Sequence, residues 1–241
     1  MANYKDIHGT NIETVTSDPD NPVNGQVWYN STDRVLKGFT SNPAGSWSSG
    51  GNVNTARYVS GGSGTQTAAL MIAGATAPPN VKRAYTESYN GSSWTEVADL
   101  NTARLYGASS GTSTSALYFG GDDGATPTVL AVTESWDGTS WTEVGDLNEA
   151  RSLVSGGGTT NTSALAFGGY PGSGRTGKTE SYNGSSWTEL TDLSTARGRM
   201  SNGPMGTKSL SLAVSGHPPS MPLSSATEEW STINTVTFTT S

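Results

Sequence analysis

The sequence TESYNGSSWTEVADLNTAR, from Thr86 to Arg104, decides the fold, because it returns almost unchanged further along the chain. It recurs as TESWDGTSWTEVGDLNEAR at 133–151 and as TESYNGSSWTELTDLSTAR at 179–197. The tryptophans of these copies are 47 and 46 residues apart. A shorter copy, TEEW, ends at Trp230, and NTAR alone ends at Arg57. Tandem copies at a fixed period are typical of a repeat architecture, in which each copy forms one structural unit.

Each repeat divides into four strand-like segments. A small-residue segment follows the arginine, as at 153–157, and an apolar segment ending in Gly-Gly comes next, as at 116–121 and 164–169. The third segment is Thr-Glu-Ser-Tyr or Thr-Glu-Ser-Trp, and the fourth begins at the tryptophan. Between them stands Asn-Gly or Asp-Gly, the strongest short hairpin signal, because both turn residues accept positive φ. Four strands in about 40–50 residues form one blade of a β-propeller.

We therefore expect an all-β, five-bladed propeller of four-stranded antiparallel blades that occupies residues 1–241 as one domain. The predicted blades lie at about 10–54, 57–100, 104–147, 151–193 and 197–241. The first blade takes its strands from 12–16, 26–29, 34–39 and 46–48, and the last blade includes 209–214 and 235–239. The alternative is four blades preceded by an N-terminal attachment segment. Ring closure removes open sheet edges that would pair with other chains.

Composition excludes several classes of protein. Hydrophobic residues make up 32% of the chain and charged residues 14%, with 31 glycines and a net charge of −7. The chain has no cysteine, which excludes disulfides and thiolate metal sites. We expect no signal peptide and no membrane insertion, because the start lacks an apolar core and no apolar run approaches ~18 residues. The acidic charge argues against nucleic acid as a partner.

Aromatic residues recur at two positions of the repeat. They are Trp47, Trp94, Trp141 and Trp187 at the first position, and Tyr89, Trp136, Tyr182 and Trp230 at the second. One interpretation is a ligand groove lined by the tryptophans. The other is packing between neighbouring blades, which we favour because large aromatics supply the apolar area that this polar sequence otherwise lacks.

Charged residues also recur once in every repeat. The arginines are Arg57, Arg104, Arg151 and Arg197, and the glutamates are Glu87, Glu134, Glu180 and Glu228. A ring of arginines could bind an anion or an acidic sugar at one end of a channel. We favour Arg–Glu pairing between adjacent blades, because a charge present in every copy is what a structural repeat requires.

The segments after Gly-Gly differ from one repeat to the next. They are 76–80, 122–127, 170–175 and 217–220, and we expect them on one face of the disc. Rigid scaffolds carry function on such loops, so we predict a ligand-binding surface there. The candidate residues are Asp122, Asp123, Tyr170, Arg175 and His217. The competing interpretation is unconstrained sequence drift in exposed loops.

The sequence gives little basis for enzyme chemistry. His8 and His217 are the two histidines and stand in dissimilar contexts, so a metal site or a Ser–His–Asp triad has few residues to draw on. We predict no catalytic residue, no cofactor and no metal. The Gly-rich stretches 61–64 and 156–158 lack the Gly-Lys-Ser/Thr ending of a phosphate loop.

The Gly-Gly after an apolar strand, followed by an aromatic residue and a later tryptophan, resembles kelch-type repeats. Residues 1–7 and 21–38, the latter reading NPVNGQVWYNSTDRVLKG, resemble a segment of bacteriophage virion and tail-fibre proteins. Phages of marine bacteria carry similar Trp-Thr-Glu-Val arrays. The resemblance implies a non-enzymatic virion component, made in the host cytoplasm, whose partners are other virion proteins or a host-surface glycan. The alternatives are a soluble carbohydrate-binding, lectin-like propeller and a propeller hydrolase or lyase.

Overall fold

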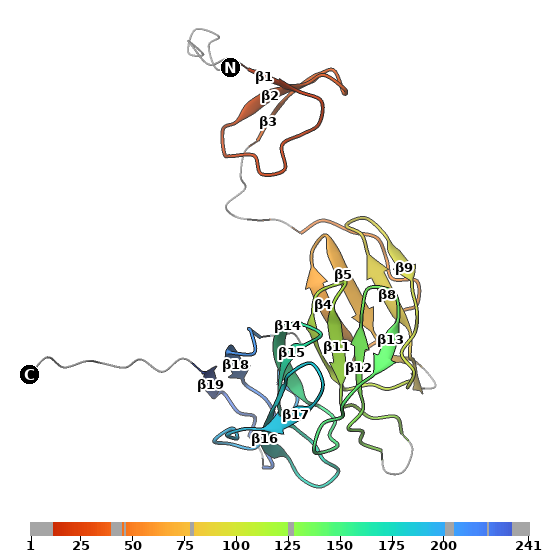
Figure 1. Ribbon diagram of the computed structural model, residues 1–241, viewed down its shortest axis with the longest axis vertical. Helices are drawn as coiled ribbons and strands as arrows, with labels where there is room; N and C mark the ends of the chain where they lie inside the picture. The colour runs from red at the N-terminus through yellow and green to blue at the C-terminus, as the bar shows by residue number, and fades with distance from the viewer. Residues whose placement is uncertain are drawn as a thin grey trace, which may run out of the picture. The chain divides into compact units, whose positions relative to one another are not determined.

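The computed structural model describes residues 12–39, 45, 47–77, 80–124, 128–200, 205–220 and 222–232 (Figure 1). These residues are all-β: they form strands, bridges and turns, and they contain no helix. In this part of the chain there is accordingly no helix with the length and apolar character needed to cross a membrane. The chain divides into two compact units, Met1–Ser49 and Gly50–Ser241.

The N-terminal unit is a small mixed sheet of β1 (Glu13–Val15), β2 (Val27–Asn30) and β3 (Val35–Gly38). β2 and β3 pair antiparallel, whereas β1 and β2 pair in parallel. An antiparallel four-stranded blade was expected here, and Trp47 and Ser48 of the expected fourth strand lie outside any strand. The difference has a physical cause, because the long connection 16–26 lets the chain cross over and return in the same direction.

Asp18 contacts three side chains of this N-terminal sheet. Its Oδ1 accepts hydrogen bonds from Trp28 Nε1 at 3.0 Å and from Asn30 Nδ2 at 2.9 Å, and its Oδ2 lies 2.8 Å from Lys37 Nζ. These contacts, that of Lys37 above all, lower the pKa of Asp18 to about 2.

The second unit contains three complete four-stranded antiparallel sheets, one for each of repeats one (57–100), two (104–147) and three (151–193). The four-strand prediction is confirmed for these three. The strands of repeat one are β4 (Gly61–Thr65), β5 (Ala68–Ile72), β8 (Thr86–Tyr89) and β9 (Trp94–Glu96). Those of repeat two are β10 (Ala108–Gly111), β11 (Ala116–Phe119), β12 (Thr133–Trp136) and β13 (Trp141–Glu143). Those of repeat three are β14 (Ser155–Thr160), β15 (Ser163–Gly169), β16 (Thr176–Tyr182) and β17 (Trp187–Glu189).

Repeat four (197–241) contributes β18 (Leu210–Val214) paired with β19 (Thr227–Ser231), and Gly206 bridges to Ser211 beside them. Its predicted last strand, 235–239, lies outside the described residues. Repeat one carries an additional ribbon in the loop after β5, formed by β6 (Ala75–Thr76) and β7 (Val81–Lys82).

The turn between the third and fourth strands is longer than the two-residue turn that Asn-Gly predicts. In repeat one it comprises residues 90–93, and Asn90 Oδ1 accepts hydrogen bonds from the backbone N–H groups of Ser92 and Ser93. Gly91 has φ +94°, whereas Asn90 is not among the residues with positive φ. The asparagine therefore acts through its side chain, as in an Asx turn.

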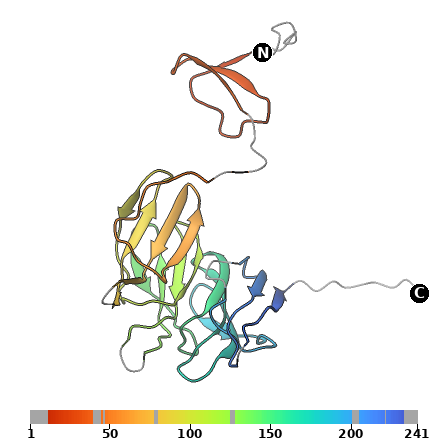
Figure 2. The ribbon, with the colours of Figure 1, turned by 180° about the vertical axis from the view of Figure 1, so that it is seen from behind.

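Consecutive sheets pack face to face, and each contact holds one apolar cluster. Leu70, Ile72, Tyr118 and Trp141 belong to the cluster between repeats one and two. Leu117, Phe119, Tyr182 and Trp187 form its counterpart between repeats two and three. Small residues of the first strand allow this approach: a Cβ on Gly156 would lie 2.6 Å from Phe119 Cζ of the preceding repeat. Figure 2 shows the sheets of repeats one and two side by side from behind.

The recurrent tryptophans divide into two groups. Trp141 and Trp187 are buried, and their indole N–H groups reach across to the preceding repeat, donating to Thr86 Oγ1 at 3.0 Å and Thr133 Oγ1 at 3.1 Å. Packing between repeats is therefore their role in the fold. Trp94 is half-buried, and Trp47 is fully exposed. The packing role predicted for all four is thus confirmed for Trp141 and Trp187. Trp94 packs on Tyr89 of its own repeat, with 5.0 Å between ring centroids, and Trp47 lies in the N-terminal unit.

Candidate functional site

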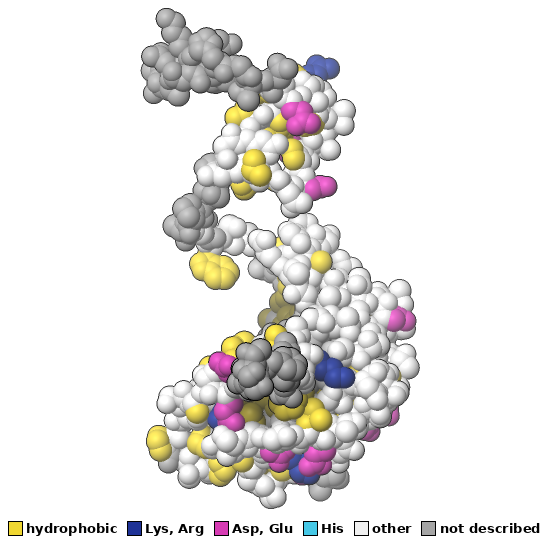
Figure 3. Space-filling view, turned by 60° about the vertical axis from the view of Figure 1, so that its left-hand side comes forward, with side chains coloured by type: hydrophobic (Ala, Val, Ile, Leu, Met, Phe, Trp, Pro, Cys, Tyr) yellow, Lys and Arg dark blue, Asp and Glu magenta, His cyan; other side chains and the backbone are white. Residues whose placement is uncertain are grey.

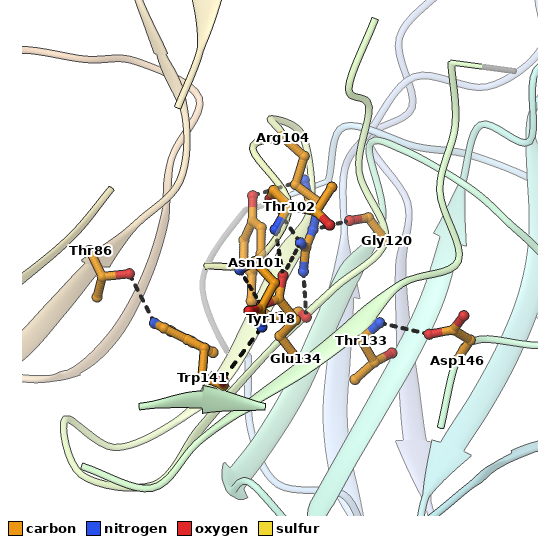
Figure 4. A network of polar contacts seen from close by, with 11 residues as sticks. Thr86, Asn101, Thr102, Arg104, Tyr118, Gly120, Thr133, Glu134, Trp141 and Asp146 are labelled. Carbon is orange, nitrogen blue, oxygen red and sulfur yellow. Dashed lines mark hydrogen bonds and ion pairs between the residues drawn. The ribbon is translucent and has the colours of Figure 1, made fainter. Parts of the chain in front are cut away.

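The Arg–Glu pairs lie inside each repeat, not between adjacent blades as expected. Arg104 Nη1 lies 2.5 Å from Glu134 Oε1, and both side chains are fully buried (Figure 4). Arg151 and Glu180 pair at 2.7 Å, Arg197 and Glu228 at 2.8 Å, and Arg57 pairs with Glu87. Arg104 also donates to the carbonyls of Gly120 and Tyr118. Because Tyr118 lies in the second strand of repeat two and Glu134 in the third, Arg104 links the start of the repeat to both strands.

The glutamates also fix the connection between successive repeats. Glu134 Oε2 accepts the backbone N–H of Asn101 at 2.7 Å, and Asn101 follows the last strand of repeat one. In repeat one, burial would raise the pKa of Glu87, but hydrogen bonds from Asn54 and Arg57 hold that pKa below its usual value. The four arginine side chains have no exposed surface, which excludes them as a ligand-binding ring.

A pocket of about 370 Å³ is lined by residues from all four repeats: Tyr58, Val59, Tyr106, Leu153 and Arg199. Val59, Tyr106, Leu153 and Arg199 each stand two positions after the recurrent arginine of their repeat. We call these residues the four-repeat ring and the space they line the shared pocket. The volume falls in the range of about 300–1,000 Å³ that is usual for small-molecule sites.

The backbone of the four-repeat ring adopts the left-handed conformation at every member. The φ values are +51° at Val59, +61° at Tyr106, +56° at Leu153 and +54° at Arg199. This conformation costs a non-glycine residue roughly 1–2 kcal/mol. It persists because neighbours hold it: Leu153 N donates to Tyr106 O at 2.8 Å, and Arg199 N donates to Leu153 O at 3.1 Å. Backbone strain of this kind clusters at ligand sites, which marks the ring as a functional candidate.

The variable loops begin directly beside this pocket. The residue before each ring member forms an antiparallel bridge with the first loop residue or, in repeat one, with the residue just before the loop: Tyr58 with Ala75, Leu105 with Asp122, Ser152 with Tyr170, and Gly198 with His217. The four loops thus start at equivalent positions around the shared pocket. Three predicted ligand residues, Asp122, Tyr170 and His217, occupy these positions; their role in ligand binding stays a prediction.

All three are engaged within their own loops, and Tyr170 OH donates to Gly172 O at 2.7 Å. Asp122 Oδ1 accepts the backbone N–H of Gly124 at 2.7 Å, and His217 Nδ1 lies 2.8 Å from Pro218 O. The carbonyl can only accept, so this contact places a proton on His217 Nδ1. The backbone N–H of Asp123, the fourth candidate, donates to Thr128 O at 3.1 Å. These contacts shape the loops.

Arg175, the remaining candidate, lies in the loop of repeat three, and Arg199 is a member of the four-repeat ring. Its guanidinium stacks on the Tyr170 ring at 5.1 Å, and the guanidinium of Arg199 stacks on the Tyr106 ring at 5.9 Å. Burial, together with the positive charge of Arg199, lowers the pKa of Arg175. The loop that carries Arg175 lies beside the four-repeat ring: Tyr170 N donates to Ser152 O at 2.7 Å, and Arg199 N donates to the carbonyl of the next residue, Leu153, at 3.1 Å.

Sequence reasoning missed the four-repeat ring, although a signal was present. Between arginine and first strand, the repeats read Arg-Tyr-Val, Arg-Leu-Tyr, Arg-Ser-Leu and Arg-Gly-Arg. The two positions after an unchanging arginine therefore vary completely. Within one chain, a position that changes from repeat to repeat beside a constant residue indicates a side chain that faces a ligand, whereas the constant residue belongs to the scaffold.

Among the described residues, no group of three or more His, Asp or Glu side chains is arranged to hold a metal ion. On the face seen in Figure 3, charged side chains are few and scattered among polar, uncharged surface. No protein-family description matches the chain, and no curated protein matches it. The site is therefore interpreted from its own geometry.

Proposed function

We propose that repeats one to four form a propeller-type binding module, without enzymatic activity, whose ligand surface is the shared pocket with its surrounding loops. The observation that carries the proposal is the pocket itself, which receives one strained residue from every repeat. Sheets that each send the same backbone position to one common space are what a ring of blades around an axis requires.

In this proposal the ring contains four blades and the N-terminal sheet is a separate attachment unit. The five-bladed alternative would need an antiparallel blade within residues 10–54. Two observations favour four blades: β1 and β2 pair in parallel, and the compact units divide after Ser49. The binding module and its attachment unit are then distinct parts of one chain.

We further propose that the chain is a virion or tail-fibre component of a bacteriophage and binds a host-surface glycan or a neighbouring virion protein. The support is the N-terminal segment 21–38, together with the near-identical tandem repeats. The separate N-terminal unit suits attachment to a particle, and the loops that differ between repeats suit recognition of a ligand.

Two measurements test the proposal. Mass spectrometry of purified virions should detect the chain, and its absence from the particles would remove the virion assignment in favour of a soluble lectin. A glycan array probed with the full chain should give selective binding. An array without any binding would leave an architectural role and contradict recognition of host glycan.

A further inference from the structure

The shared pocket has a mostly apolar lining, and two arginines, Arg199 of the lining and Arg175 of a neighbouring loop, accompany it. Val59 and Leu153 supply aliphatic surface, Tyr58 and Tyr106 supply aromatic surface, and Arg199 is the charged member of the lining. Arg175 belongs to the loop of repeat three, which starts at Tyr170, and Tyr170 N donates to the carbonyl of Ser152, the residue before the ring member Leu153. An aromatic and aliphatic wall with few polar groups is typical of a small-ligand site.

The two arginines have no acidic partner among the described residues. Every ion pair of this part of the chain involves Arg57, Arg104, Arg151, Arg197, Lys37 or Lys178. Arg175 and Arg199 instead stack on tyrosine rings. A contact with the face of an aromatic ring uses none of the guanidinium N–H groups as a donor to an acid, so these donors can serve a planar anion.

Two like charges held close together repel each other, and an anion between them relieves the repulsion. This arrangement stands out in a chain of net charge −7, where an accidental cluster of cations is disfavoured. A carboxylate is the anion that matches a guanidinium in shape, because both are planar and form two parallel hydrogen bonds. The aromatic and aliphatic lining, in turn, suits the C–H face of a sugar ring.

We propose that the shared pocket binds an acidic saccharide through its carboxylate, with Arg199 as the main anion contact and Arg175 as the second. This inference rests on the proposed glycan recognition and names its ligand class. The sugar ring packs against Tyr106 and the aliphatic residues of the pocket. Binding should weaken at high ionic strength, because the arginines stand at a solvent-accessible site.

The test is a chemical-shift titration of the isotope-labelled full chain with D-glucuronate, D-glucose and inorganic phosphate. Glucuronate should bind in preference to both of the other probes. Arg199→Gln should raise the glucuronate Kd about tenfold or more, since a hydrogen bond to a charged group is worth about 1.5–3 kcal/mol and each 1.4 kcal/mol is tenfold in Kd. Arg175→Gln should raise it by a smaller factor.

Arg34→Gln is the matched control, because Arg34 has φ +59° and lies in the separate N-terminal unit. This variant should bind glucuronate like the parent, and all three variants should melt like the parent. The inference fails if glucuronate does not bind, if Arg199→Gln behaves like Arg34→Gln, or if phosphate or glucose binds as tightly as glucuronate. If Arg199→Gln leaves glycan binding on the array undiminished, this inference fails and the proposed function stands.

Discussion

The contact between repeats two and three differs from the contact between repeats three and four in what fills the space between the two sheets. In the former, Trp187 fills the space and donates to Thr133 Oγ1. In the latter, a cavity of about 160 Å³ is lined by Leu165, Phe167, Thr179, Leu193, Ala213 and Trp230. Thr179 is the equivalent of Thr133, and sequence register places Thr235, outside the described residues, at the tryptophan position.

The contrast shows what the recurrent tryptophan contributes. Where it is present, its neighbours Leu147 and Tyr182 are buried. Their equivalents at the contact of repeats three and four, Leu193 and Trp230, are half-buried. The indole of Trp187 therefore fills the space between the sheets of repeats two and three. Three sets of variants and a change of pH test how buried groups stabilise the complete and the incomplete repeats, in order of decreasing effect.

The largest effect is expected from Trp141→Ala. Removing this buried ring leaves a cavity between repeats one and two and an unpaired Thr86 hydroxyl, so the free energy of unfolding should fall by about 3–5 kcal/mol. Urea denaturation followed by tyrosine and tryptophan fluorescence measures the change. Trp94→Ala is the control and should cost clearly less, because Trp94 is half-buried. A Trp141→Ala variant that unfolds like the parent would contradict the packing role.

Glu134→Gln should destabilise the chain by about 3 kcal/mol, because it leaves the buried Arg104 without its counter-charge. The amide oxygen still accepts a hydrogen bond, which keeps the loss near the lower end for broken buried pairs. Glu228→Gln is the comparison in repeat four, where the carboxylate side chain is 24% exposed and the loss should be smaller. Equal losses, measured by chemical denaturation, would show that burial does not distinguish the two pairs.

Thr235→Trp should raise the free energy of unfolding by filling the contact between repeats three and four. Because the sequence register makes residue 235 the equivalent of Trp187, we expect an indole there to fill the cavity beside Thr179, and cavity filling commonly adds about 0.5–2 kcal/mol. Thermal melting measures the gain. Thr235→Trp combined with Thr179→Val should lose part of the gain, since the indole N–H loses its acceptor. A Thr235→Trp variant no more stable than the parent would show that this space is not a tryptophan site.

Acidification should have the smallest effect. The folded-state pKa values of Glu87 and Glu228 are lowered: burial opposes this shift, and hydrogen bonds accepted from backbone N–H groups, together with the positive charge of the paired arginine, outweigh burial. A lowered pKa contributes stability that is present above the usual carboxyl value of 4.5 and is lost as the pH falls through the folded value. Urea midpoints at pH 7, 4 and 3 should therefore decrease. A midpoint that rises on acidification would reverse the sign of this linkage.

Prediction from the sequence was most accurate where structure depends on near neighbours. The strand-turn-strand order, the four-stranded sheets of repeats one to three and the packing of Trp141 and Trp187 followed from alternating polarity and turn residues. The first strand of repeat three was placed two residues early, because Leu153 belongs to the turn at the pocket and not to β14. Local propensity does not reveal such a turn, since neither leucine nor valine favours positive φ.

The sequence by itself determined that this chain is a tandem array of small antiparallel sheets joined through recurrent aromatic residues. Only the tertiary structure decided that the Arg–Glu pairs close within each repeat, that Trp47 stays exposed, and that the residue two positions after each arginine enters a shared pocket. Strand formation depends on residues a few positions apart. The approach of Arg175 to Arg199, by contrast, depends on the angle between sheets, which is set by packing across the whole array.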